Sequence, residues 1–98
     1  MEKSINRRLV LMAKLHQADW PGLSINIGLT GRARRALWWA GARTGLDAYL
    51  LLVKRQQIPD LGEGTASVVL RRLLAWAETA PEVPVPDDIE FQERVFAL

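Results

Sequence analysis

The chain has 98 residues, of which 49% are hydrophobic and 24% charged, with a formal net charge of +2 and no cysteine. This length accommodates one domain and excludes an enzyme built from two lobes around a cleft. The apolar fraction is typical of a folded protein and too high for intrinsic disorder. Without cysteine, the chain has no disulfide framework, thiolate zinc site, iron–sulfur cluster or cysteine nucleophile.

The apolar segments predict a soluble, cytoplasmic protein. Polar residues follow Met1 with no apolar stretch behind them, so we expect no signal peptide. The longest mainly apolar run, residues 46–53, is too short to span a bilayer. We therefore expect no membrane partner.

Charge is divided unevenly along the chain. Residues 1–55 carry a formal charge of +7 and residues 56–98 a charge of −5. Such asymmetry favours an anionic partner for the first half, nucleic acid being one candidate. The alternative is that the two halves neutralise each other within one fold or across a dimer.

The first expected element is a helix that Ser4 caps and that ends near residues 19–20, before Pro21 and Gly22. A β-strand is expected next, at about residues 23–30, because apolar Leu23, Ile25, Ile27 and Leu29 alternate with Ser24, Asn26 and Gly28. A single strand has no pairing partner within the chain. We therefore expect it to pair across a homodimer.

Helices are expected over most of the remaining chain. Thr30 caps the next one and Gly45 follows its end as the C′ residue. Another covers residues 46–57, and Thr65 caps a longer one that stops before Pro81. Residues 81–86 hold three prolines and should be extended, and Asp87 or Asp88 then caps a short final helix.

The expected fold class is mainly α, with four to five short helices and one short strand. Residues 1–80 form one helical domain, and residues 81–98 form an acidic, proline-rich tail that docks on the domain or on a partner.

Catalysis is poorly supported by the residues present. His16 is the only histidine and falls on the apolar face of the first helix, where we interpret it as a packing residue. No nucleophile motif surrounds Ser4, Ser24 or Ser67. One histidine without cysteine does not make a structural zinc site. We expect no enzyme activity, cofactor, metal or small-molecule substrate.

Binding is better supported. Residues 31–39 bring three arginines and two tryptophans onto one expected helix, and helical spacing aligns Arg32, Arg35, Trp39 and Arg43, with Arg34 and Trp38 beside them. Arginines suit phosphate contacts, and a tryptophan can stack on an exposed base. The alternative is that the tryptophan pair belongs to the core or to a dimer interface, because large aromatic residues usually bury area.

Residues 25–54 resemble the ribbon–helix–helix family of DNA-binding regulators: an alternating strand, a helix, a turn at residues 45–47 and a second helix. The resemblance implies a strand pair from two chains in the major groove of DNA. Asn26 would then read a base edge. Gly28 departs from the family, which usually presents a long polar or basic side chain there.

Two hypotheses follow. In the first, the chain is a small DNA-binding transcriptional regulator, with Asn26 at a base and Arg32, Arg34, Arg35 and Arg43 at phosphates. In the second, it is a phage-type inhibitor or adaptor that blocks a host protein machine through Trp20, Trp38, Trp39 and Trp76.

Overall fold

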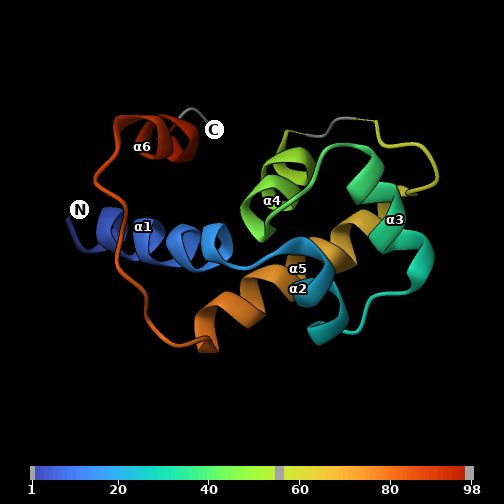
Figure 1. Cartoon of the computed structure of the whole chain (residues 1–98), viewed down its shortest axis with the longest axis horizontal. Helices are drawn as coiled ribbons and strands as arrows, with labels where there is room; N and C mark the ends of the chain where they lie inside the picture. Colours follow the sequence, from blue (N-terminus) through green and yellow to red (C-terminus); the bar gives the residue numbers. More distant parts are fainter. Residues whose placement is uncertain (1, 55–56, 97–98) are drawn as a thin grey trace.

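The computed structural model describes residues 2–54 and 57–96, which form six helices (Figure 1). The predicted mainly helical class is confirmed. The helices are α1 (Glu2–Gln17), α2 (Trp20–Asn26), α3 (Gly31–Trp39), α4 (Gly45–Val53), α5 (Glu63–Thr79) and α6 (Ile89–Phe96). Within the described residues, no helix is both long and apolar enough to cross a membrane.

The core lies where α1, α4 and α5 pack against one another. The buried residues of the core come from all six described helices, and its large buried side chains include Met12, Leu15, Trp20, Leu37, Leu46, Val69, Leu73 and Val95. In Figure 1, α5 runs obliquely to α1, and α3 lies at the end of the molecule opposite the N-terminus. Helix α3 therefore lies at one end of the molecule, where its outer face is open to solvent.

The predicted strand at residues 23–30 is wrong, because residues 20–26 are helical. The Asp19 side chain accepts a hydrogen bond from the Gly22 N–H, and Pro21 lies in the first turn, where its missing N–H costs nothing. Alternation would place Leu23 and Ile25 on the same face, but Leu23 is buried and Ile25 is 63% exposed. The helix satisfies its own backbone, which removes the reason for pairing across a homodimer.

The segments before α2 and before α4 pair with each other. The Trp20 N–H donates to the Arg43 carbonyl, and the Gly45 N–H donates to the Ala18 carbonyl, both at 2.9 Å. These bonds flank an isolated antiparallel bridge between Asp19 and Thr44. These bonds thus hold the end of α1 close to the start of α4.

Several helix boundaries differ from the predictions. Helix α1 runs from Glu2 to Gln17, so Ser4 lies inside it and not at its cap, and α4 ends at Val53, short of the predicted residue 57. Helix α3 ends at Trp39 and is followed by Gly41, whose φ of 114° makes it the left-handed residue after the helix. Gly45, predicted for that role, is buried in the first turn of α4. Helix α5 begins at Glu63, two residues before the predicted cap Thr65, with Gly62 as its N-cap.

The C-terminal segment returns to the helical body. Residues 81–88 have no regular secondary structure, and the Asp88 carboxylate then accepts a hydrogen bond from the Phe91 N–H as α6 begins. Phe91 and Val95 are buried, and α6 contacts α1. The ring of Phe91 lies 5.3 Å from the ring of His16, tilted by 54°.

Basic side chains from outside the helix concerned donate hydrogen bonds at the C-terminal ends of four helices. The Lys14 ammonium is buried and donates to the Ala77 carbonyl in the last turn of α5 at 2.9 Å. Arginine side chains donate to carbonyls at the ends of α2, α3 and α6: Arg72, Arg43 and Arg8. A cation at this end of a helix satisfies free carbonyls and opposes the negative end of the macrodipole. These four basic side chains therefore stabilise the fold through hydrogen bonds to helix ends.

Asp47 closes the start of α4 and also ties it to α6. Its carboxylate accepts hydrogen bonds from the backbone N–H groups of Arg43 and Thr44, and Arg94 lies 2.6 Å away. Burial by itself raises the pKa of this carboxyl. The backbone bonds and the Arg94 guanidinium outweigh burial, so the pKa lies below its ordinary value of 3.8.

Asp47→Asn should lower the free energy of unfolding at pH 7 by about 0.5–2 kcal/mol, because it removes the anion from the capping box and from Arg94. The folded-state pKa lies below the unfolded one, so the stability from Asp47 is present above pH 3.8 and lost as pH falls through the folded pKa. Urea denaturation at pH 7 and at pH 3 should show a smaller acid-induced loss in Asp47→Asn than in the wild type. An equal loss in both proteins contradicts this role. Asp87→Asn, at an exposed carboxylate, is the control.

Candidate nucleic-acid interface

Helix α3 carries the densest positive charge of the described residues. Thr30 caps it by accepting a hydrogen bond from the Ala33 N–H, and Ala33, Ala36 and Leu37 face the core. This registry leaves Arg32, Arg35 and Trp39 on the outer face, all of them exposed. Three of the four predicted arginines and Trp39 are thus brought together on one helix, which contains no acidic residue.

The guanidinium groups of Arg34 and Arg35 converge at the first turn of α3. A Cβ atom added to Gly31 would lie 3.4 Å from Arg35 Nη1 and 3.5 Å from Arg34 Nη2, so both groups lie beside this glycine. Among the side chains that the structure describes, in residues 7–54 and 57–96, the ion pairs are Arg7–Glu78, Arg32–Asp60 and Arg94–Asp47, and none involves Arg34 or Arg35. The positive end of the α3 dipole adds to this uncompensated charge.

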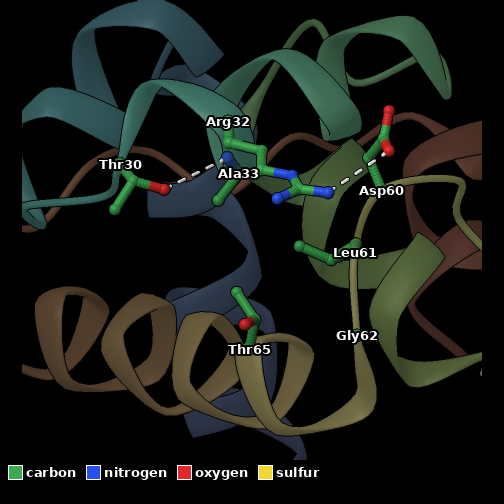
Figure 2. A pocket seen from close by; sticks show the side chains of 7 residues that line it. All are labelled: Thr30, Arg32, Ala33, Asp60, Leu61, Gly62 and Thr65. Carbon is green, nitrogen blue, oxygen red and sulfur yellow. Dashed lines mark hydrogen bonds and ion pairs between the residues drawn. The ribbon is translucent and has the colours of Figure 1, made fainter.

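A groove follows α3 and is lined on its other side by residues 60–62 and by Thr65 at the start of α5 (Figure 2). The Arg32 side chain reaches across it to Asp60, at 3.6 Å. Beyond this pair the groove continues toward Trp39 as a cavity of about 540 Å³ lined by Arg32, Arg35, Ala36, Trp39, Ala40, Pro59 and Asp60. Arg32 and Asp60 belong to both parts.

The four tryptophans, predicted together as interface residues, have different environments. Trp39 is 80% exposed, and Trp38 is 36% exposed with the Arg43 guanidinium 3.7 Å from its ring centroid. Trp76 is half-buried and packs against the core. Trp20 is 1% exposed, and its indole N–H donates to the Arg34 carbonyl at 3.0 Å. Trp20 is therefore a core residue, which corrects its prediction as a contact residue.

Three of the predicted nucleic-acid contacts, Asn26, Arg34 and Arg43, do not line this groove. Arg43 donates to the carbonyls of Trp38 and Ala42 while it covers the Trp38 ring, so its guanidinium is already engaged. Asn26 is exposed and is the last residue of α2. It therefore lies on a helix, whereas its predicted contact with a base required a strand in the DNA groove. The strand on which the ribbon–helix–helix resemblance depends is absent from the described residues.

No metal-binding cluster of three or more histidine, aspartate or glutamate side chains occurs among the residues that the structure describes. His16 lies against Phe91, and its buried Nδ1 has no hydrogen-bond partner there. The residues that sequence reasoning missed are Pro59 and Asp60, which face α3 from a loop. Their distance from Arg32 in the chain leaves no local pattern by which to find them.

No protein-family model matches the chain, and comparisons with curated proteins and with solved structures found no match.

Proposed function

We propose that the protein is a small, non-enzymatic DNA-binding regulator of the cytoplasm that contacts DNA through α3. The observation that carries the proposal is the pair of guanidinium groups of Arg34 and Arg35, which both lie beside Gly31 without an acidic partner among the described side chains. Phosphate oxygens are suited to fill such a position, because arginine binds them through several parallel hydrogen bonds.

The proposed contact differs from that of the ribbon–helix–helix family. It uses a helix face in place of a β-ribbon, and it requires no second chain. The homodimer was predicted because the expected strand needed a pairing partner, and that strand is absent from the described residues. The homodimer therefore stays a prediction. Light scattering tests it, because a monomer has a mass of 11.0 kDa and a dimer twice that mass.

Arg34→Ala combined with Arg35→Ala should weaken binding to a DNA oligonucleotide by at least about tenfold at low salt. Each phosphate contact releases condensed counterions, so losing two of them should flatten the log–log dependence of affinity on salt by about 1.5. Fluorescence anisotropy of a labelled oligonucleotide across a salt series measures both quantities.

Arg7→Ala combined with Arg71→Ala is the matched control, because it removes the same charge at exposed positions on α1 and α5. The proposal expects this control to retain most of the affinity and the wild-type salt slope. Equal losses in the two double variants would show that only net charge matters, which contradicts a defined contact at α3.

The exposed Trp39 also favours the second hypothesis, an inhibitor or adaptor that binds a host protein. Tryptophan and arginine are the residues most enriched at the centres of protein interfaces. A partner of this kind would present acidic side chains to α3. Its affinity should fall much less steeply with salt than that of a phosphate contact.

A further inference from the structure

We propose that the groove along α3 binds unpaired nucleotides, with Trp39 stacking on a base and Arg32 and Arg35 holding the adjacent phosphates. This inference rests on the proposed function and specifies its ligand as single-stranded rather than duplex DNA. Three features of the groove support it: the exposed indole of Trp39, the cavity beside this indole, and the solvent-exposed ion pair between Arg32 and Asp60.

The indole of Trp39 is the first feature. It is 80% exposed, whereas Trp20 fills the core and Trp38 is covered by Arg43. Exposed aromatic rings next to basic side chains are the means by which proteins bind single strands, since every base offers a flat face for stacking. A base in a duplex is already stacked on its neighbours, and freeing it costs a few kcal/mol.

The shape of the cavity beside Trp39 is the second feature. Trp39 and Pro59 both line it, together with the small side chains of Ala36 and Ala40. Its volume of about 540 Å³ lies within the range of small-ligand sites. The cavity is thus suited to a flat group with stacking faces, such as a nucleobase, and Arg35 lines the same cavity, where it can hold the phosphate.

The Arg32–Asp60 pair is the third feature. Its side chains are 76% and 73% exposed and 3.6 Å apart, and ion pairs of this kind contribute little to stability. A phosphate entering the groove can therefore take the place of the Asp60 carboxylate at Arg32. The Asp60 carboxylate competes with an anionic ligand for Arg32, so removing the charge of Asp60 should strengthen binding of that ligand.

The test compares a ten-residue oligothymidylate, a duplex of the same length and poly-L-glutamate, each titrated into the full chain. We expect Trp39→Ala to weaken oligothymidylate binding roughly 5- to 150-fold, the range for loss of one stacked base. Trp38→Ala is the matched control and should change the affinity by less than about twofold, because the Arg43 guanidinium covers its ring. Circular dichroism checks that both variants are folded.

A second variant predicts a change in the opposite direction. Asp60→Asn should tighten oligothymidylate binding by up to about fivefold, the worth of an exposed ion pair. Asparagine tolerates the left-handed backbone of residue 60, whose φ is 69°, as well as aspartate does. The substitution therefore changes the charge without straining the loop.

The outcomes separate the two proposals. If neither DNA binds, the proposed function is wrong and this inference falls with it. If the duplex binds as tightly as the single strand and Trp39→Ala has no effect, DNA binding stands and this inference is wrong. If poly-L-glutamate binds as tightly as oligothymidylate, the groove recognises an acidic protein, which also overturns the inference.

Discussion

Trp20→Ala is expected to lower the free energy of unfolding by about 3–5 kcal/mol, the usual cost of emptying a buried aromatic site. The indole is 1% exposed, and its N–H joins α2 to the Arg34 carbonyl of α3. Because small domains unfold with about 5–15 kcal/mol in total, this loss is a large share of the stability. Urea denaturation followed by circular dichroism measures it.

Trp39→Ala is the matched control, since it removes the same side chain from a position that is 80% exposed. We expect its free energy of unfolding to stay within about 0.5 kcal/mol of the wild type. If the Trp20→Ala protein is as stable as the wild type, Trp20 is not a core residue, and its predicted role as a contact residue stands.

Gly45→Ala is expected to lower the free energy of unfolding by about 1–3 kcal/mol through overpacking. A Cβ atom at this position would lie 2.5 Å from Leu23 Cδ2 and 3.0 Å from the backbone oxygen of Leu15. The Leu23 side chain can move, but the Leu15 carbonyl belongs to α1 and can shift only with that helix. The same urea denaturation, read as a change of midpoint, tests this.

Gly64→Ala serves as the control for Gly45→Ala, because it lies in the first turn of α5 with nothing within 4 Å of its Cβ position. Alanine there restricts the unfolded chain without a clash and should leave the protein unchanged or up to about 1 kcal/mol more stable. Equal effects at the two glycines would mean that α1 and α4 do not meet as closely as described.

Local chemistry was enough to predict the elements whose signals lie within a few residues of one another. Thr30 and Asp88 cap the helices that they were expected to cap, and α5 stops before Pro81 as predicted. The arginine face of α3 was also predictable, because helical spacing alone aligns residues 32, 35 and 39. A cap or a helix face depends on neighbours in the chain, and those can be read in the sequence.

Tertiary packing decided the remainder. Alternation at residues 23–29 suits a half-buried strand, yet burial of Trp20, Leu23 and Ser24 against the core and the cap at Asp19 favour a helix. The same applies to the charges, because Arg43 is drawn to the end of α3 while Arg34 and Arg35 are left without an acidic neighbour in the described structure. The groove itself joins α3 to a loop at residues 59–62. Contacts between segments so distant along the chain depend on how the helices pack, and no local pattern contains that information.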